Sequence, residues 1–248
     1  MADGVALTAN EKVSIGPSAS FIWRRLHSLS GLVPVGLFLC YHIYENMSAL
    51  NGAEAYNESV NKVNSLLPRP YFYGVEIALI LAPLLFHSLY GLYIASTGRS
   101  NTSSYPYSTN WAYWAQRISG YVAFVYILVH VGVLRFAVTL MGHHLAPYQG
   151  PGPGGLDLVS YDDVAAHLGN TQLISARTWA AGDHIFALYL VGTLLTIWHF
   201  TNGLNGFAWT WGIAVGRVAQ KRVRIFAWVL FALMAVGTLN ILFKMRFG

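Results

Sequence analysis

The sequence predicts an all-α integral membrane protein, and three observations support this fold class. Hydrophobic residues make up 55% of the 248 residues and charged residues only 10%, whereas about a quarter of a soluble domain is charged. Five apolar runs of about 20 residues are each long enough to cross a bilayer as a helix. In the first four runs a histidine lies deep within the apolar stretch. The runs cover residues 29–50, 74–97, 117–140, 184–207 and 225–243, and we expect them to form a single membrane domain over residues 1–248.

Composition excludes several other classes. The formal charge of +5 does not indicate a nucleic-acid-binding protein, because the basic residues gather in short segments between the apolar runs. The single cysteine, Cys40, excludes a disulfide within the chain and an iron–sulfur cluster held by its own thiolates. The first 20 residues lack the basic start, apolar middle and cleavage site of a secretory signal, so the first run itself is expected to direct insertion.

The distribution of basic residues predicts the orientation in the membrane. Five helices place the two ends of the chain on opposite sides, and the positive-inside rule assigns the more basic side to the cytoplasm. That side holds the N-terminus, and the connection of about 141–183 then lies outside. The cytoplasmic basic residues are Lys12, Arg24, Arg25, Arg99, Arg117, Arg217, Lys221, Arg222 and Arg224, and the outer ones are Lys62, Arg69, Arg135, Arg177, Lys244 and Arg246.

The four deep histidines need a common cause, because a polar ring at bilayer depth is costly and rare. With a helical rise of about 1.5 Å per residue, His42 and His130 lie roughly 18–20 Å from the cytoplasmic ends of their helices, and His87 and His199 roughly 10–12 Å. Two histidines at each of two depths are what two bis-histidine haems require, since each iron takes one imidazole from either side. The pattern predicts a four-helix bundle that holds two stacked haems.

Glycines near the histidines are expected to make room for the flat macrocycles. Gly91 follows His87 by four residues and Gly203 follows His199 by four, so no side chain stands one turn along from either imidazole. The shared His-x-x-x-Gly-Leu pattern is part of a weak internal repeat. The first and third helices each open with a basic residue and Ser-Gly, at Arg25, Ser30 and Gly31 and at Arg117, Ser119 and Gly120; Gly31 is expected at the inner-haem level, whereas Gly120 fits less well.

Other residues in the apolar runs and loops have simpler expected roles. Pro34 and Pro83 are expected to kink their helices, and residues 156–183 are expected to contain a short surface helix. His27 and His184 lie at helix ends, where an interfacial role, a contact to a haem propionate and no role at all remain open. The histidines of the outer loop are predicted to be solvated: His143, His144 and His167.

A succession of short motifs carries a family resemblance over residues 20 to 245. The motifs are Arg24-Arg25-Leu26-His27-Ser28, Pro34-Val35-Gly36, Tyr41-His42, Pro83-Leu84-Leu85-Phe86-His87, Tyr90-Gly91, Asn110-Trp111, Gln116-Arg117, His130, and Trp198-His199-Phe200-Thr201-Asn202-Gly203-Leu204 followed by Thr210-Trp211-Gly212. In this order they resemble the cytochrome b membrane subunit of bacterial succinate dehydrogenase, of the single-chain, five-helix, two-haem type that quinol:fumarate reductases share.

The resemblance implies the haem ligands and the partners. It makes His42 and His130 the ligands of the outer haem b, and His87 and His199 those of the inner one. It also implies a separate flavoprotein subunit with FAD, an iron–sulfur subunit on the cytoplasmic face, and electron flow through the two haems to menaquinone in the bacterial cytoplasmic membrane. Some fumarate-reducing relatives carry a membrane glutamate where this chain has Ile197, which favours succinate oxidation here.

Candidate quinone and propionate contacts lie at both ends of the helices. Glu45, Asn46 and Glu76 are near the outer ends of the first two helices, where they are candidates for proton handling or for binding a quinone carbonyl, as well as for ordinary interfacial roles. Trp23, Arg24, His27 and Ser28 near the inner face are candidates for a second quinone site or for holding haem propionates.

Two other classes of protein stay open at this point. A cytochrome b anchor of a quinol:fumarate reductase, or of another quinone-linked enzyme such as a hydrogenase or formate dehydrogenase, would keep the haems and change the electron donor. A haem-free, proton-coupled transporter would use the histidines as a proton relay, but it would not need them at two matched depths.

Overall fold

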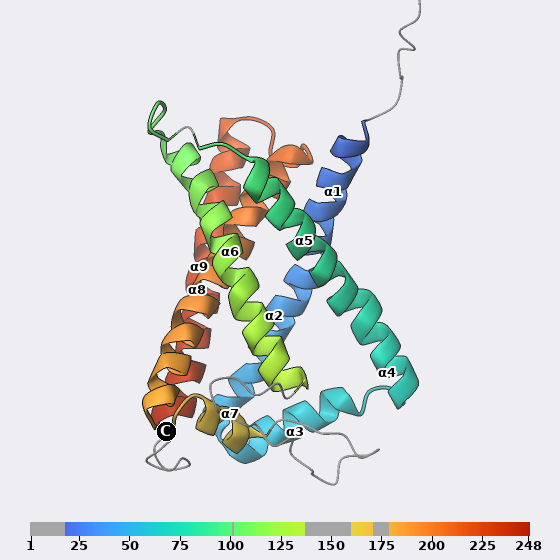
Figure 1. Ribbon diagram of the computed structural model, residues 1–248, viewed down its shortest axis with the longest axis vertical. Helices are drawn as coiled ribbons and strands as arrows, with labels where there is room; N and C mark the ends of the chain where they lie inside the picture. Colours follow the sequence, from blue (N-terminus) through green and yellow to red (C-terminus); the bar gives the residue numbers. More distant parts are fainter. Residues whose placement is uncertain (1–17, 101, 137–159, 171–178) are drawn as a thin grey trace, which may run out of the picture.

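The computed structural model describes residues 18–100, 102–136, 160–170 and 179–248, and every regular element in this part of the chain is helical (Figure 1). The elements are α1 (Ala19–Leu32), α2 (Pro34–Asn46), η1 (Met47–Asn51), α3 (Ala53–Asn64), α4 (Arg69–Glu76), η2 (Ile77–Leu81), α5 (Ala82–Thr97), α6 (Ser108–Phe136), α7 (Tyr161–His167), α8 (Trp179–Thr210) and α9 (Arg217–Phe247).

Five helical segments are long and apolar enough to cross a membrane, as the sequence predicts. They are Ala19–Asn51, Pro70–Thr97, Ser108–Phe136, Asp183–Thr210 and Arg217–Phe247. The predicted boundaries were wrong at several ends: the first, third and fifth helices begin earlier than expected, and residues 137–140 lie outside the described residues. Hydropathy detects only the apolar middle of each span, whereas polar and aromatic turns at the membrane surface continue the same helix.

Prolines mark irregular points in the first two spans. The first span is interrupted at Val33, directly before Pro34, which has no N–H to donate and crowds the preceding turn. The second span widens into one π-helical stretch, η2, directly before the turn that contains Pro83. At Pro34, where a kink is predicted, the helix is interrupted, while at Pro83 the helix continues after a change of winding.

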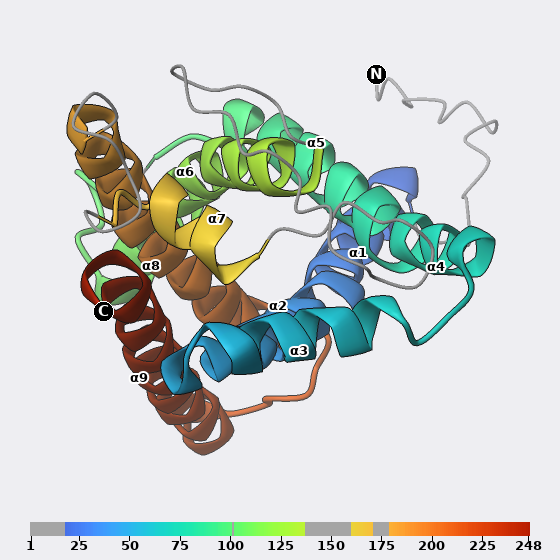
Figure 2. The ribbon, with the colours of Figure 1, turned by 90° about the horizontal axis from the view of Figure 1, so that it is seen from below.

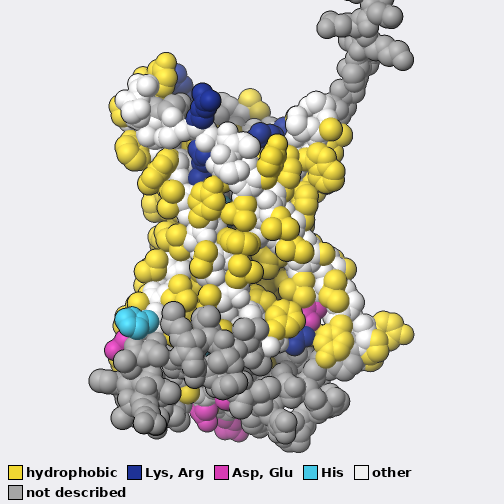
Figure 3. All heavy atoms as spheres, viewed as in Figure 1, with side chains coloured by type: hydrophobic (Ala, Val, Ile, Leu, Met, Phe, Trp, Pro, Cys, Tyr) yellow, Lys and Arg dark blue, Asp and Glu magenta, His cyan; other side chains and the backbone are white. Residues whose placement is uncertain are grey.

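The first four spans contact one another, and α9 packs mainly against α8 and touches α2 and η1. Figure 3 shows apolar side chains around the waist of the molecule, with most of the visible Lys and Arg side chains at one end. We call this the basic end; it contains the start of α1, the end of α5, the start of α6, the end of α8 and the start of α9. The opposite end, covered by α3 and α7, is called the capped end (Figure 2).

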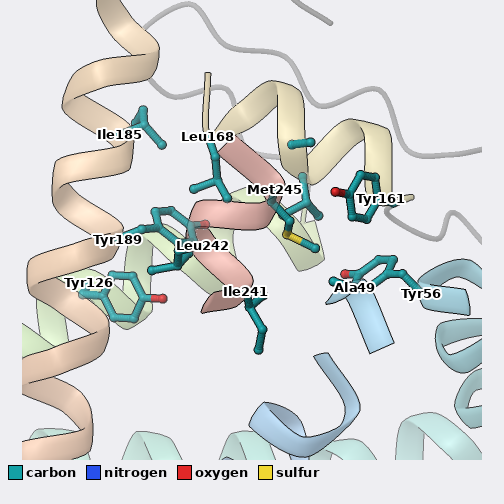
Figure 4. Close-up of a cluster of buried hydrophobic side chains, with 12 residues drawn as sticks. Ala49, Tyr56, Tyr126, Tyr161, Leu168, Ile185, Tyr189, Ile241, Leu242 and Met245 are labelled. Atoms are coloured by element: carbon teal, nitrogen blue, oxygen red, sulfur yellow. The ribbon is translucent and has the colours of Figure 1, made fainter. Parts of the chain in front are cut away.

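The capped end holds the main buried cluster (Figure 4). Short helix α7 begins with a capping box, in which the Ser160 hydroxyl accepts from Asp163 N at 3.2 Å and the Asp163 carboxylate accepts from Ser160 N at 3.0 Å. Asn57 of α3 accepts a bond from Tyr161 N at 2.9 Å, which joins the two surface helices. The cluster contains Ala49, Tyr56, Tyr126, Tyr161, Val164, Ala165, Leu168, Ile185, Tyr189, Ile241, Leu242 and Met245.

Arg246 fastens the last turn of α9 to this cap. Its buried guanidinium donates to the carbonyls of Leu168 (2.8 Å) and Gly169, and it pairs with Asp183 at the start of the fourth span. The amide of Asn170 donates in turn to Met245 O at 2.9 Å. The predicted surface helix in the loop is therefore present as α7, whereas α3 was missed, because a short amphipathic helix gives no long apolar run.

Candidate functional site

The structure brings the four deep histidines together as two facing pairs. At the basic end, the rings of His87 on α5 and His199 on α8 have centroids 6.1 Å apart and planes at 82°. Nearer the capped end, the rings of His42 on α2 and His130 on α6 have centroids 5.8 Å apart and planes at 78°. These are the same two pairs that helical depth groups together, although their role as ligands stays a prediction.

Both imidazoles of the basic-end pair face a backbone carbonyl on a neighbouring helix. His87 Nδ1 lies 2.9 Å from His27 O, and His199 Nδ1 lies 3.0 Å from Gln116 O. A carbonyl oxygen can only accept, so both Nδ1 atoms carry a proton, and in the neutral ring Nε2 then keeps a free lone pair. This is the tautomer that a metal-binding imidazole needs when Nε2 is the ligand atom.

Glycines let the neighbouring helices approach these rings. A Cβ at Gly31 would lie 2.1 Å from Cε1 of His87, and a Cβ at Gly120 would lie 3.0 Å from Cε1 of His199. Real Cβ atoms essentially never come closer than 3.0 Å to such an atom, so Gly31 is required by the present position of His87. Gly120, which the sequence spacing fitted less well, has the equivalent place beside His199.

The glycines of the His-x-x-x-Gly-Leu pattern lie elsewhere than expected. We predicted open space beside Gly91 and Gly203 for a macrocycle. A Cβ at Gly91 would instead lie 3.0 Å from His27 Nε2, and a Cβ at Gly203 would lie 3.3 Å from the Gln116 side-chain nitrogen. This prediction was wrong, because each glycine accommodates a polar side chain of the adjacent helix.

The capped-end pair has different surroundings. His42 Nδ1 lies 3.3 Å from the amide nitrogen of Asn46, which also donates to His42 O at 2.7 Å. His130 Nδ1 is buried and has no hydrogen-bond partner among the described residues. Aromatic rings enclose His130 instead, with the centroids of Tyr126 and Tyr189 each 5.6 Å from its own.

His167 of α7 extends this aromatic group toward the surface. Its ring centroid lies 5.5 Å from that of Tyr189, and only 1% of the residue is exposed. The expectation that His167 is solvated was therefore wrong, because α7 folds inward over the end of the bundle. The other loop histidines of that expectation, His143 and His144, lie outside the described residues, and His184 is exposed at the start of the fourth span.

The predicted contacts at the inner face divide into two groups. His27 stacks on His87, with centroids 4.2 Å apart and planes at 4°, and its Nε2 is buried without a hydrogen-bond partner among the described residues. Ser28 accepts from the Trp211 indole N–H at 3.1 Å. Trp23 packs near Phe86, 5.9 Å between ring centroids, and remains 49% exposed, while Arg24 is exposed.

Arg25 is a residue that the sequence reasoning missed at this end. Its guanidinium lies 4.9 Å from the ring centroid of Phe21 and 5.2 Å from that of Trp211. One of its terminal nitrogens, Nη1, is buried and has no hydrogen-bond partner in the described part of the chain. A buried, unpaired donor of this kind is suited to an anionic group, and the sequence signal was present in the Arg24-Arg25 pair.

Near the capped end, Glu76 forms an ion pair that the sequence did not predict. Its two carboxylate oxygens accept from Arg135 Nε at 2.6 Å and Nη2 at 2.7 Å, a bidentate arrangement between α4 and α6. The Arg135 guanidinium also lies 5.8 Å from the ring centroid of Tyr73. Glu76 is therefore the partner of a fixed cation rather than an isolated acid.

Glu45 is half-buried on α2 and contributes to the electrostatics of the capped end. Burial is the main cause that raises the pKa of the Tyr56 phenol above its ordinary value, and the negative charges of Glu45 and Asp163 raise it further. Burial, followed by the charge of Asp162, likewise raises the pKa of Tyr161. Tyr56 therefore stays neutral, and its hydroxyl keeps its proton, at physiological pH.

Comparison with known proteins identifies the family. A scan against protein-family profiles finds no match. The succinate dehydrogenase cytochrome b558 subunit of Bacillus subtilis (strain 168) is 34% identical over 223 residues, which cover 90% of this chain and 96% of the relative. The chain belongs to the family of succinate dehydrogenase cytochrome b558 subunits. The family resemblance expected from the motifs is confirmed, and the five apolar helices agree with a multi-pass membrane protein.

Proposed function

We propose that this protein is the dihaem cytochrome b membrane anchor of a succinate:menaquinone oxidoreductase. The observation that carries the proposal is the presence of two facing histidine pairs, at two levels of one helical bundle, in a member of the cytochrome b558 family. His42 and His130 would hold one haem b, and His87 and His199 the other.

The spacing of the rings supports haem binding. An imidazole nitrogen binds a first-row metal at about 2 Å, and the ring centre lies roughly 1 Å behind it, so two rings across one iron have centroids about 6 Å apart. The two pairs have separations of 5.8 and 6.1 Å. Among the described residues no three His, Cys, Asp or Glu side chains gather into a metal site.

The basic end and the capped end of the molecule have separate roles in this proposal. When bound, the haems supply one-electron transfer across the membrane between an iron–sulfur subunit and quinone. The basic end is proposed to face the cytoplasm, where the iron–sulfur subunit docks beside a flavoprotein that carries FAD. Arg25, Ser28 and Trp211 lie at this end and are proposed, with His27, to face the propionates of the inner haem.

The quinone is proposed to bind near the capped-end pair. Glu76 and Arg135 form a charged hydrogen-bonding group between the second and third spans, and Glu45 and Asn46 follow His42 by three and four residues, about one turn. Arg135 can donate to a quinone carbonyl only through the guanidinium N–H groups that are not bonded to Glu76. Replacing Glu76 with Gln and finding unchanged quinone reductase kinetics would remove this residue from the site.

The proposed direction is succinate oxidation. Ile197 is 1% exposed on α8, so its apolar side chain is packed at the position where some fumarate-reducing relatives carry a glutamate. No acidic side chain is thus available at this point of the fourth span to move protons with the electrons.

Spectroscopy of the purified complex tests the proposal. We expect two low-spin b haems per chain in reduced-minus-oxidised spectra and in haem extraction, and the loss of a different haem in His42→Ala and His199→Ala. Co-purification of a flavoprotein and an iron–sulfur protein identifies the donor, and a different dehydrogenase partner would contradict succinate oxidation. One haem or none in the wild-type complex would overturn the two-level assignment, and the absence of any haem would favour a haem-free transporter.

A further inference from the structure

The basic-end histidines occupy equivalent places in the internal repeat. His87 faces the backbone carbonyl of His27 and packs on Gly31, while His199 faces the carbonyl of Gln116 and packs on Gly120. The glycine four residues after each histidine completes the pattern: the His27 side chain lies over Gly91, and the Gln116 side chain lies over Gly203. His27 and Gln116 are therefore structural counterparts, one from each half of the repeat.

Gln116 makes a denser set of contacts than its counterpart. Its side-chain nitrogen donates to His199 O at 2.9 Å, and its side-chain oxygen accepts from Asn202 Nδ2 at 2.8 Å. Asn202 also lies 3.2 Å from Ala112 O, one turn before Gln116 on α6. Two amide side chains thus join α6 and α8 beside the histidine.

The same contacts decide which way the imidazole of His199 points. Gln116 O, the acceptor for His199 Nδ1, also receives the Ser119 hydroxyl at 3.1 Å, and Ser119 is 1% exposed. A buried carbonyl with two donors is held in place, and a sliding of α6 along α8 would break all the bonds between these two helices together. Such outer contacts commonly set the tautomer and the ring rotation of a metal-binding histidine.

We infer that Gln116 and Asn202 are positioning residues for the inner haem ligand: their amides lock α6 to α8 so that the Gln116 carbonyl fixes His199 with Nδ1 protonated and Nε2 free. Gly203 contributes to this arrangement, because the Gln116 side-chain amide lies directly over it. The inference rests on the proposed haem function of His199. It assigns the second His-x-x-x-Gly glycine to polar packing between helices.

The experiment uses the full complex with Gln116→Leu, Gln116→Glu and Asn202→Leu. Glutamate keeps an acceptor for Asn202 and loses the donor to His199 O, so it separates the two bonds. Asn240→Leu is the control, because the Asn240 amide is exposed on α9 and, within the described part of the chain, donates only to Val236 O of its own helix, at 2.9 Å. The readouts are the low-spin electron paramagnetic resonance signals, the midpoint potential of each haem and the rate of haem loss.

We expect the signal and the potential of one haem to shift in the Leu variants and in Gln116→Glu, while those of the other haem stay constant. The rate at which the affected haem is lost should rise roughly tenfold or more, which is the usual size of the effect when such an outer contact is removed. The haem that shifts must be the one lost in His199→Ala. Asn240→Leu should leave both haems unchanged.

Two results would overturn the positioning role. One is two haems with wild-type signals in Gln116→Leu and Asn202→Leu; the other is an equal shift of both haems, which would indicate general loosening of the bundle. If Gln116→Leu does not assemble, Gln116→Glu and Asn202→Leu decide by the same criteria. A wild-type complex without haem would instead overturn the proposed function, and this inference with it.

Discussion

The two histidine pairs have almost the same ring separation, 6.1 and 5.8 Å, yet they are held in different ways. At the basic end each Nδ1 faces a carbonyl of another helix, and a glycine lets that helix approach. At the other level His42 meets an amide of its own helix, and His130 is enclosed by tyrosine rings with no hydrogen bond to Nδ1 among the described residues.

The two pairs thus differ in how their rings are supported: hydrogen bonds hold the basic-end imidazoles, and aromatic packing surrounds His130 at the capped end. A hydrogen bond to a fixed carbonyl selects both the tautomer and the rotation of an imidazole, whereas aromatic packing restricts only its volume. The basic-end histidines are therefore more strictly oriented than the capped-end ones. Substitutions that act on each mode of support should affect one pair and spare the other.

The largest expected effect comes from filling the glycine contact at the basic end. In Gly31→Ala the new methyl group meets the imidazole of His87, so the ring or the helix must move, at a cost of about 1–3 kcal/mol in stability. We expect the inner haem to be lost or altered while the outer haem remains. Haem quantitation and difference spectra measure this.

Two matched substitutions control for the added methyl group. Gly120→Ala, where the Cβ would lie 3.0 Å from His199 Cε1, should have a smaller effect than Gly31→Ala. Gly132→Ala on α6, where nothing lies within 4 Å, should have none. Equal effects at all three positions would contradict the role of close approach.

The corresponding test of the capped-end pair is Gly192→Ala on α8. A Cβ at this position would lie 2.3 Å from Cδ2 of Tyr126, whose ring packs on His130. We expect the outer haem to change while the inner haem keeps its spectrum, because the Tyr126 ring packs on His130, which is proposed as a ligand of the outer haem only. A change confined to the inner haem would show that the two environments are not independent.

A smaller effect is expected when the ion pair near the capped end is broken. Arg135→Ala leaves the Glu76 carboxylate, 17% exposed, without its partner and should lower stability by about 1–2 kcal/mol. This is below the cost for a fully buried pair, because about a third of the Arg135 side chain is exposed. Thermal melting in detergent measures the loss, and the double variant with Glu76→Ala should recover part of it.

The smallest effect is a pH dependence at the cap itself. The pKa of Tyr56 is raised in the folded protein, chiefly by burial, so the unfolded chain loses this proton first as the pH rises above about 10. Stability from this group is complete below that pH and falls by about 1.4 kcal/mol per unit above it, until the folded pKa is reached. The stability of the Tyr56→Phe variant should fall less steeply between about pH 9 and 11 than that of the wild type in melting experiments. An unchanged slope would exclude Tyr56 as the cause.

Local sequence patterns were sufficient for the spans and for the depth of each histidine. Long apolar runs give helices of predictable rise, so His42 and His130 share one level and His87 and His199 another without any knowledge of packing. The loop helix α7 was also within reach, because Ser160 and Asp163 form a recognisable capping box. The amphipathic helix α3 was missed, since it has no long apolar run.

Contacts between helices could not be predicted in the same way. Glu76 meets Arg135 across 59 positions of the chain, and Gln116 meets His199 across 83. Nothing in a single sequence gives the rotation and crossing of two helices that make such a contact. The prediction that His167 is solvated was wrong for the same reason, because its burial depends on where α7 folds over the bundle.

The sequence by itself determined that this chain has five membrane-spanning helices and that four of them carry a histidine at one of two depths, because hydropathy and helical rise are properties of each segment alone. Only the tertiary structure decided which carbonyl, amide or tyrosine supports each ring. These partners come from different helices, and they meet only when close packing at glycines sets the distance and the rotation between those helices.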